Sequence, residues 1–506
     1  MLSRLPSAAL RGLQAEPVDV EVDLSRGLPA WNMVGLPEAA VREARDRVRS
    51  ALLNSGFEFP LRHITVNLSP ADRRKDGAHF DLPVAMGLLL ASEQFKAAEE
   101  VASFPFMLGE LALDGRLNPV PGVLPLAMFA REQGFTSLIV PEGNAHEASM
   151  VSGMNVLPAT SLLQAVTHLA GRSLLTPYAE PQKSTELDKD LPDLADIRGQ
   201  LQARRALEIA AAGGHHMLLS GPPGVGKSML AKRLPGILPP LTLEQRLEVA
   251  RIFSVSGDTG RSLHDSSPPF RSPHHSASDV AMIGGGSTPR PGEVSRADYG
   301  VLFLDELAEF KRPVLEVLRQ PLEDGKVCIA RASDTLEFPA RFQLLAAMNP
   351  CPCGYLGHPT RACTCSPSQI NRYRQRISGP LLDRFDLQVH VPPVNKDELA
   401  RMRPGESSRD VAMRVLAARQ RQYDRLGDGG VNARMSQQQI ERHAHPDADG
   451  ARLLDTAMQR FSLSARSYHR ILKVARTIAD LAEDEKLAAS HIAESLQYRG
   501  EGFSAW

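Results

Sequence analysis

The stretch Met217-Leu-Leu-Ser-Gly-Pro-Pro-Gly-Val-Gly-Lys-Ser228 decides the fold of the middle of this 506-residue chain. An apolar run predicts a buried strand, the pattern G-x-x-x-x-G-K-S follows it, and a helical pattern begins at Met229. In that context the glycines let backbone N–H groups surround phosphate oxygens at the positive end of a helix. The lysine reaches the β and γ phosphates, and the serine hydroxyl takes a place on Mg²⁺. The stretch therefore predicts a nucleotide-binding loop made of Gly221, Pro222, Pro223, Gly224, Val225, Gly226, Lys227 and Ser228.

Three further motifs supply the groups that nucleotide hydrolysis requires. Four apolar residues lead into Asp305 and Glu306 at the carboxyl end of a predicted strand, where α/β sheets bind ligands. We expect Asp305 to hold Mg²⁺ through water and Glu306 to orient and polarise the attacking water. A third strand ends at Asn349. If this strand lies between the other two, the Asn349 amide faces the γ-phosphate and the water. Arg384 follows a short helix and fits the arginine finger that enters the site of a neighbouring subunit.

The sequence divides into three predicted domains. Residues 1–171 mix short strands with helical patterns and are expected to form an α+β domain, and the polar, proline-containing range 172–192 is expected to be a linker. Residues 193–393 alternate helices with buried strands, which indicates an α/β fold with a largely parallel sheet. Only helical patterns remain in 394–506, so a helical third domain is expected there.

Composition limits the partners and the location. The chain has 58 Lys and Arg against 59 Asp and Glu, a formal net charge of −1, so any site for a polyanion has to be local. The longest apolar run, 82–92, is half of the ~20 residues that a membrane span requires. The first residues of the chain lack the apolar core of a signal peptide. The sequence therefore predicts a soluble, cytoplasmic protein with no membrane partner.

The order of these motifs resembles that of AAA+ ATPases. More specific are Phe270-Arg-Ser-Pro-His-His275, Pro291-Gly-Glu-Val-Ser295 and Gly300-Val-Leu-Phe-Leu-Asp-Glu-Leu307, which resemble the magnesium-chelatase branch, a relative of the MCM helicases. The resemblance implies ATP and Mg²⁺ as cofactors. It also implies a helix-2 insertion within residues 253–290.

Two more features follow from the same resemblance. A β-hairpin is implied before Asn349, and residues 326–338 fit it, with Arg331 near the tip. The helical domain should also carry a second phosphate-contacting arginine, the sensor-2 residue. Arg466 matches that motif best, and Arg470 and Arg476 lie close enough to be alternatives.

The first domain resembles the Lon-type protease domain, which has an S5-like fold. The matching segments are Lys75-Asp-Gly77, the helical range 81–90, Gly109-Glu-Leu-Ala-Leu-Asp-Gly-Arg-Leu117 and Pro121-Gly122. In Lon proteases the nucleophilic serine stands where this chain has His79, and its partner lysine where this chain has Leu124. Neither residue can replace a serine activated by a buried lysine. The resemblance therefore implies a non-peptidase scaffold.

An inactive Lon-like domain joined to a magnesium-chelatase-type AAA+ module and a helical lid is similar to the architecture of the ComM family, also called YifB. This resemblance implies a hexameric ATP-driven motor on single-stranded or branched DNA, which promotes branch migration when DNA is integrated during natural transformation. Alternatives are a magnesium-chelatase motor, an ATP-dependent protease, and a nucleotide-gated scaffold without translocation. The missing Lon dyad disfavours the protease, and the absence of a metal-dependent adhesion module disfavours the chelatase.

Four of the five cysteines form a cluster directly after Asn349. Cys351, Cys353, Cys363 and Cys365 have the spacing C-x-C-x9-C-x-C on a loop rich in glycine and proline. Four thiolates could close tetrahedrally on Zn²⁺ and stabilise a segment without a core. Reduced unliganded cysteines and a redox dithiol remain alternatives, and His358 is a possible substitute ligand.

Two arginine-rich stretches are candidates for contact with DNA phosphates or with a neighbouring subunit. The first contains Arg361, Arg372, Arg374 and Arg376, and the second contains Arg401, Arg403, Arg409, Arg414, Arg419, Arg421 and Arg425. For the second stretch, a solvated helix face explains the charges equally well. If DNA is the partner, its affinity should fall steeply as salt rises, because neutralised phosphates release counterions.

Overall fold

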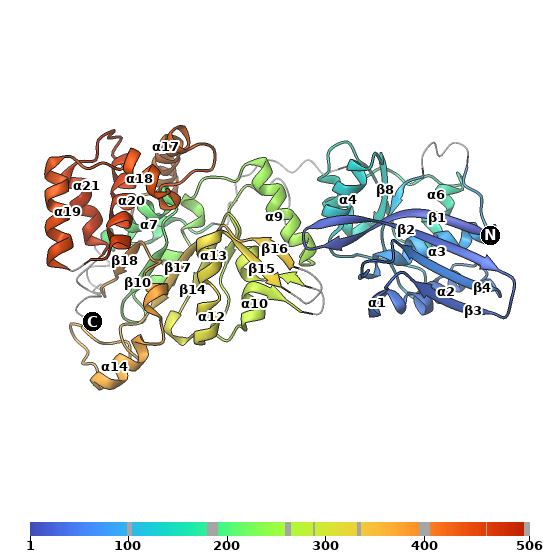
Figure 1. Cartoon of the computed structure of the whole chain (residues 1–506), viewed down its shortest axis with the longest axis horizontal. Coiled ribbons are helices and arrows are strands. Elements are labelled where there is room, and N and C mark those ends of the chain that lie inside the picture. The colour runs from blue at the N-terminus through green and yellow to red at the C-terminus, as the bar shows by residue number, and fades with distance from the viewer. Residues whose placement is uncertain are drawn as a thin grey trace.

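The computed structural model describes residues 1–98, 104–179, 191–258, 265–286, 289–330, 335–393, 405–461 and 463–499. The molecule is elongated, with the N-terminal part at one end, a parallel sheet in the middle and a helical bundle at the other end (Figure 1). No helix in these ranges combines the length and the apolarity needed to cross a membrane.

The N-terminal part begins with a four-stranded sheet in the order β1-β2-β4-β3. Along β2, Val18, Val20, Val22 and Leu24 are buried while the acidic residues between them are not, which is the alternation of a half-buried strand. The strands are β1 (Leu2–Arg11), β2 (Gln14–Ser25), β3 (Ala30–Val34) and β4 (His63–Ser69). Helices α1 (Ala39–Arg42), α2 (Ala44–Asn54) and α3 (Asp81–Ala91) accompany this sheet, and α3 is buried on almost every side.

A second, smaller layer completes the N-terminal part. Its three-stranded parallel sheet has the order β5-β8-β9, beside a two-stranded ladder of β6 and β7. The strands are β5 (Phe106–Met107), β6 (Glu110–Leu111), β7 (Leu117–Asn118), β8 (Ser137–Pro141) and β9 (Asn155–Ala159), and the helices are α4 (Val123–Glu132), α5 (Ala145–Ser149) and α6 (Leu162–Leu169). Mixed strands and helices confirm the predicted α+β class.

The central part is a five-stranded parallel sheet in the order β11-β14-β17-β10-β18. Alternate residues of each strand enter different cores: Leu219, Phe303 and Leu345 face one cluster, and Leu218, Leu302 and Leu344 face the other. Both faces are therefore covered, as a parallel sheet requires. The strands are β10 (Met217–Ser220), β11 (Phe270–Arg271), β14 (Val301–Leu304), β17 (Gln343–Met348) and β18 (Leu387–His390).

Helices and two short ladders surround this sheet. The helices are α7 (Leu201–Gly213), α8 (Lys227–Ala231), α9 (Leu243–Val255), α10 (Asp279–Ile283), α11 (Glu293–Arg296), α12 (Arg312–Glu316), α13 (Arg319–Asp324), α14 (Pro367–Arg374) and α15 (Gly379–Leu382). One ladder joins β12 (Gly284–Gly285) to β13 (Arg290–Pro291), within the implied insertion. The other joins β15 (Lys326–Ala330) to β16 (Thr335–Pro339) and is the expected hairpin; Arg331 lies outside the described residues.

The C-terminal part is helical, as predicted. It contains α17 (Ser408–Leu426), α18 (Gln437–His443), α19 (Ala448–Arg460), α20 (Ala465–Leu481) and α21 (Ala489–Gln497). Val411 and Val415 of α17, with Val474 and Ile478 of α20, enter the same core as α7 and one face of the sheet. We call this part the lid, because it packs against the central part through that shared core.

The N-terminal part is joined to the central part by direct contacts. Leu13, at the turn between β1 and β2, packs with Ile252, Val255 and Phe338. The backbone N–H of Leu124 donates to the Ser254 hydroxyl at 3.3 Å. The turn of the first hairpin therefore rests on α9 and on the β15–β16 hairpin.

Candidate nucleotide site

The loop between β10 and α8 has the geometry of a phosphate cradle. Gly224 and Gly226 adopt φ values of 79° and 93°, which L residues rarely adopt, and so turn the loop back on itself. The Nζ of Lys227 donates to the carbonyls of Gly221 and Pro222 at 2.6 and 2.8 Å. Burial lowers the pKa of Lys227 to about 8. An anionic ligand would compensate this cation, since the nearest carboxylates, Asp305 and Glu306, only partly offset the cost of burial.

Asn349 lies directly beside this lysine. Strand β17 is placed between β14 and β10, the arrangement on which the expectation for Asn349 depended. The Oδ1 of Asn349 accepts a hydrogen bond from Lys227 Nζ at 3.1 Å. The carboxyl ends of three neighbouring strands therefore bring the lysine, the amide and the two acids to one edge of the sheet.

The hydroxyl of Ser228 donates to Asp305 Oδ2 at 2.6 Å. A hydroxyl and a carboxylate at this distance suit the coordination sphere of Mg²⁺, which prefers oxygen and retains water ligands. The donor set thus fits the implied nucleotide and its metal: the loop offers backbone N–H groups and a lysine to phosphate, and Ser228 and Asp305 offer oxygen to Mg²⁺.

Glu306 is held in an unusual conformation. Its backbone is left-handed, with φ 53° and ψ 47°, which costs a residue other than glycine about 1–3 kcal/mol. Its side chain is half-exposed, and Oε2 lies 3.4 Å from Nδ1 of His275. His275 ends the motif that begins with β11, and the sequence pattern alone indicated no separate role for it. Only the neighbouring placement of β11 and β14 brings it to Glu306.

Arg384 and Arg466 have no polar contact with the phosphate loop of their own chain among the described residues. Arg384 donates to the Pro380 carbonyl at 2.6 Å and to Glu323. Burial lowers the pKa of Arg384, and the charges of Arg319, Arg470 and Arg466 lower it further. Within the described residues, no hydrogen bond or ion pair joins Arg384 or Arg466 to residues 221–228.

The two alternatives for the sensor-2 arginine have other partners. Arg476 is buried, pairs with Asp480 at 2.9 Å and donates to the Glu485 carbonyl at 2.6 Å. It is therefore part of the lid core and cannot reach a phosphate without breaking that core. Arg470 lies 3.8 Å from Asp386. Of the three, Arg466 alone forms no ion pair with another described residue.

The four clustered cysteines converge after β17. Their sulfurs lie within 4.8 Å of one another, and three pairs are separated by 3.4, 3.5 and 3.6 Å. Zn–S bonds of about 2.3 Å in a tetrahedron place sulfurs about 3.8 Å apart, so the donor set fits Zn²⁺. Hydrogen bonding from the backbone of Tyr355 lowers the pKa of the Cys353 thiol to about 5. His358 instead accepts from the Thr360 and Arg361 backbone at 3.2 and 3.1 Å and is not part of the cluster.

The cysteine loop contacts the nucleotide site. Gly354 has φ 83°, and a Cβ at this position would lie 2.7 Å from Pro223 of the phosphate loop. Burial raises the pKa of Tyr373 to about 12, and a hydrogen bond joins its hydroxyl to the backbone of Asn349. The loop thus packs between Pro223 and the strand end that carries Asn349.

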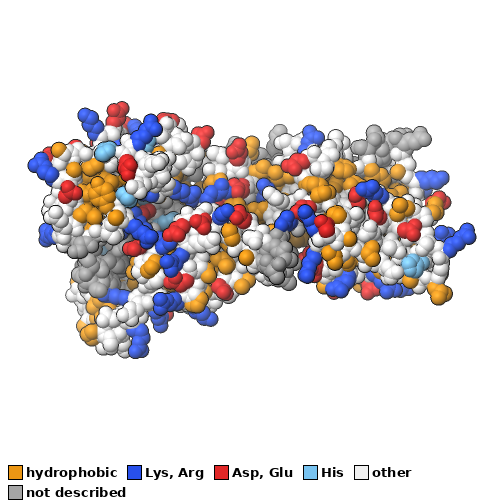
Figure 2. All heavy atoms as spheres, in the orientation of Figure 1, with side chains coloured by type: hydrophobic (Ala, Val, Ile, Leu, Met, Phe, Trp, Pro, Cys, Tyr) orange, Lys and Arg blue, Asp and Glu red, His pale blue; other side chains and the backbone are white. Residues whose placement is uncertain are grey.

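Most of the arginines in the two basic stretches interact with other residues of the same chain. Arg376 pairs with Glu309 at 2.8 Å, and Arg361 stacks on Tyr355 at 4.0 Å. In the second stretch, Arg414 pairs with Glu208 at 2.6 Å and Arg425 with Asp480 at 2.7 Å. Arg401 and Arg403 lie outside the described residues. On the face seen in Figure 2, basic and acidic side chains are intermixed over the central part and the lid.

The two residues at the positions expected for the Lon dyad, His79 and Leu124, are both buried. The Nε2 of His79 donates to the Ala8 carbonyl at 2.9 Å, and burial lowers the pKa of His79 to about 4. Leu124 is fully buried. Neither side chain is accessible to a substrate.

Fold and site together define the central part and the lid as an AAA+ ATPase module of the magnesium-chelatase type, with ATP and Mg²⁺ as cofactors. Three family descriptions match: "Magnesium chelatase, subunit ChlI" over residues 193–399, "Subunit ChlI of Mg-chelatase" over 20–144, and "Magnesium chelatase, subunit ChlI C-terminal" over 405–499.

The chain is 48% identical to the competence protein ComM of Haemophilus influenzae, over 97% of this chain and 96% of that protein. It is 45% identical to the uncharacterized protein YifB of Escherichia coli, over 98% and 97% of the two chains. The chain therefore belongs to the ComM/YifB family. Two partial similarities accompany these: 23% identity to the Lon protease of Rhizobium meliloti over 27% of this chain and 18% of that protein, and 26% to the Holliday junction branch migration complex subunit RuvB of a Parafrankia species over 46% and 54%.

Proposed function

We propose that this protein is a hexameric, ATP-driven DNA translocase that promotes branch migration, and that it acts in the integration of DNA during natural transformation. The observation that carries the proposal is full-length similarity to a competence protein, combined with the convergence of Lys227, Asn349, Ser228 and Asp305 at one edge of the sheet. The partial similarity to a branch-migration subunit points to the same kind of substrate.

In this proposal the residues at the sheet edge divide the work of hydrolysis. Residues 221–226 and Lys227 bind the phosphates, and Ser228 and Asp305 hold Mg²⁺. Glu306 takes the proton of the attacking water, and Asn349 orients that water. The bound metal would supply charge neutralisation at the phosphates.

Arg384 and Arg466 act on the neighbouring subunit. Neither arginine makes a polar contact with the phosphate loop of its own chain among the described residues, which is compatible with a nucleotide held by a second copy. Arg384 must then leave Glu323 when subunits assemble. This requirement supports a ring rather than a monomer.

Zinc and the N-terminal domain have structural roles in the proposal. Cys351, Cys353, Cys363 and Cys365 would bind one Zn²⁺ and fix the loop against Pro223. The domain at 1–171 acts as a non-peptidase scaffold, since buried His79 and Leu124 occupy the positions of the Lon dyad. We also propose that the domains are separated by a linker at 172–192 and by a boundary at residue 393. The helix-2 insertion and the tip of the hairpin are proposed to contact DNA.

The decisive experiment is ATP-dependent migration of synthetic three-strand and Holliday junctions. Wild-type protein should displace the labelled strand, and DNA should stimulate its ATPase activity. Lys227→Ala should lose nucleotide binding, whereas Glu306→Gln should bind ATP and leave the junction unmoved. A wild type that hydrolyses ATP with no strand displacement at any junction would instead support the nucleotide-gated scaffold.

A further inference from the structure

A second cavity lies at the opposite edge of the parallel sheet from the nucleotide site. Gly214 precedes β10, Gly300 precedes β14 and Gln343 begins β17, so the cavity is at the amino ends of the strands. Its accessible volume is about 120 Å³. Sites for whole small molecules commonly measure about 300–1,000 Å³, so this cavity suits a small anionic group such as phosphate rather than a whole drug-sized ligand.

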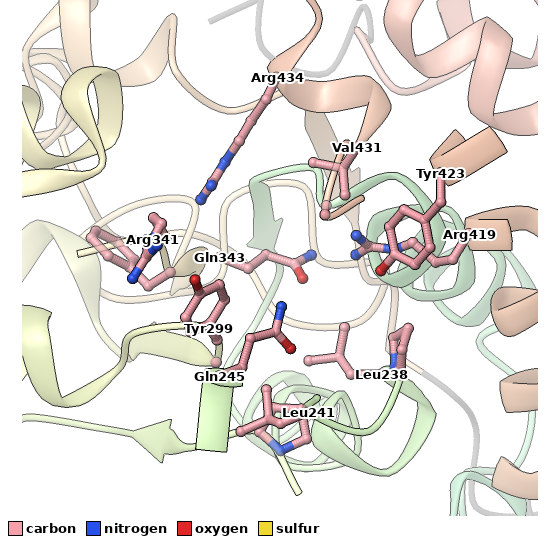
Figure 3. A pocket seen from close by; sticks show the side chains of 16 residues that line it. Leu238, Leu241, Gln245, Tyr299, Arg341, Gln343, Arg419, Tyr423, Val431 and Arg434 are labelled. Carbon is pink, nitrogen blue, oxygen red and sulfur yellow. The ribbon is translucent and has the colours of Figure 1, made fainter. Parts of the chain in front are cut away.

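Two parts of the protein build its walls. Leu238, Leu241 and Gln245 come from the segment around the start of α9, in the central part. Arg419, Tyr423, Val431 and Arg434 come from α17 and the segment that follows it, in the lid. Figure 3 shows the two groups facing each other across the opening. A ligand here would touch both the central part and the lid.

Three arginines line the cavity, and only Arg341 forms ion pairs with carboxylates among the described residues. Arg341 stacks on Tyr299 at 4.2 Å and pairs with Asp298 at 3.0 Å and with Glu248. The guanidinium of Arg419 donates to the Ala211 carbonyl at 3.1 and 2.8 Å, and the described residues offer it no carboxylate.

Arg434 is the most available of the three cations. Its side chain extends into the cavity toward Arg341 and Tyr299 (Figure 3). No hydrogen bond or ion pair joins its guanidinium to another described residue. The side chain of Arg434 is exposed, and desolvation lowers its pKa while the charge of Asp298 raises it in part. Arg419 is buried, and burial lowers its pKa to about 10, with the charge of Arg434 adding to the effect. An anion in the cavity would favour the charged form of both guanidinium groups.

The remaining lining adds a hydrogen-bond donor and apolar walls to the cavity. The Oε1 of Gln245 accepts a hydrogen bond from the Thr242 backbone N–H at 3.0 Å, so the NH₂ group of Gln245 can donate to a ligand. Leu238, Leu241 and Val431 supply apolar wall, and Tyr423 supplies an aromatic ring. Unpaired guanidinium groups prefer phosphate or carboxylate oxygens, and they bind phosphate in bidentate fashion.

We propose that this cavity is a second phosphate-binding site, separate from the ATP site, and that an occupant fixes the lid against the central part through Arg434 and Arg419. The phosphate belongs either to a free nucleotide or to the backbone of DNA. This site does not depend on the proposed DNA motor, because it can be measured without hydrolysis or strand displacement.

The test uses the full chain with Lys227→Ala, so that the ATP site contributes little. Inorganic phosphate is titrated calorimetrically into this protein and into versions that also carry Arg434→Glu, Arg434→Lys or Arg442→Glu. Arg442 is an exposed arginine of α18 outside the cavity and serves as the matched control. Arg434→Glu should weaken binding at least about tenfold, equivalent to about 1.4 kcal/mol. Arg434→Lys should retain most of the affinity, and Arg442→Glu should equal the parent.

A parent that binds no phosphate, or Arg434→Glu with the parent's affinity, overturns the proposal. Two further titrations identify the source of the phosphate. Tighter binding of thymidine monophosphate than of a short oligothymidylate, lost in Arg434→Glu, assigns the site to free nucleotide. The reverse order, with the same loss, assigns it to DNA. Hydrogen exchange should also show slower exchange at α17 on binding, since the ligand joins the lid to the central part.

Discussion

The imidazole Nδ1 of His275 lies 3.4 Å from the Oε2 of Glu306, although the two residues come from different loops of the sheet edge. His275 follows β11, and Glu306 follows the neighbouring strand β14 in a left-handed conformation. The contact limits the positions that a half-exposed carboxylate can adopt. His275 is thus a positioning residue for the group proposed to activate water.

Replacing His275 by alanine should lower the turnover of ATP by about tenfold. General-base catalysis contributes about 10²–10⁴ to a rate, and a base that is present but poorly placed loses part of that factor. The KM for ATP should change little, because the phosphate loop is untouched. Steady-state hydrolysis across ATP concentrations separates the two constants. His274→Ala is the control, since His274 bonds to Ser276 instead, at 2.8 Å. Equal turnover in wild type and His275→Ala would remove His275 from this role.

Much of the central fold follows from local sequence pattern. The run that precedes Asp305 forms β14 at Val301–Leu304, and the apolar run before the glycine-rich loop forms β10. Long helices such as α17 and α20 also lie where periodicity predicts them. Such segments carry enough apolar residues at one spacing to specify their own structure.

Contacts between distant segments could not be predicted in this way. β5, β6 and β7 are two residues long, too short for any periodicity. Glu323 pairs with Arg384, and His275 with Glu306, only because the sheet order brings their loops together. The number of arginines also did not show which of them are available, because Arg414 pairs with Glu208 of α7 in the central part and Arg425 pairs with Asp480 of α20 in the lid. A charge pattern shows which residues are basic, while the fold decides which of them remain free.

Removing the side chain of Arg384 should abolish turnover and spare ATP binding. An arginine finger contributes about 10³–10⁵ to the rate, and Arg384 makes no polar contact with its own phosphate loop. Arg384→Ala is measured for hydrolysis and for binding of a fluorescent nucleotide, with the exposed Arg372→Ala as control.

Mixing tests whether the finger acts between subunits. Arg384→Ala and Lys227→Ala subunits are each inactive alone, but a mixed ring contains some interfaces with an intact loop facing an intact finger. Partial activity should therefore return on mixing. A mixture as inactive as its components, in rings shown to contain both subunits, would argue for action within one chain.

The cysteine loop should contain about one zinc ion per chain. Elemental analysis of purified protein measures the metal, and Cys363→Ser should lose it, because three thiolates close a tetrahedral site poorly. Cys328→Ser should keep it, since Cys328 lies on β15, apart from the cluster. Loss of zinc should also lower ATP turnover by about tenfold, because the loop packs against Pro223 and Asn349. Zinc-free wild-type protein with full activity would contradict both expectations.

The N-terminal domain should lose stability in acid through His79. Burial lowers the pKa of this histidine to about 4, from 6.5, so the folded domain binds fewer protons than the unfolded chain between these values. Its contribution to stability is therefore complete above pH 6.5 and is lost as the pH falls toward 4. A shift of this size corresponds to about 3 kcal/mol. Asp81 opposes the trend, because burial raises its pKa to about 6 and protonation there favours the folded state.

The variant His79→Gln isolates the histidine from Asp81. Glutamine can still donate to the Ala8 carbonyl but carries no charge in acid. Denaturant unfolding is followed by the fluorescence of Trp31, on β3, in a Trp506→Phe background so that one tryptophan reports on this domain. The stability of His79→Gln relative to wild type should rise steadily between pH 6.5 and 4. If the stability difference between His79→Gln and wild type stayed constant over this range, His79 would bind a proton equally well in the folded and the unfolded chain. Its buried position beside Phe80 makes the charged form costly and argues against that result.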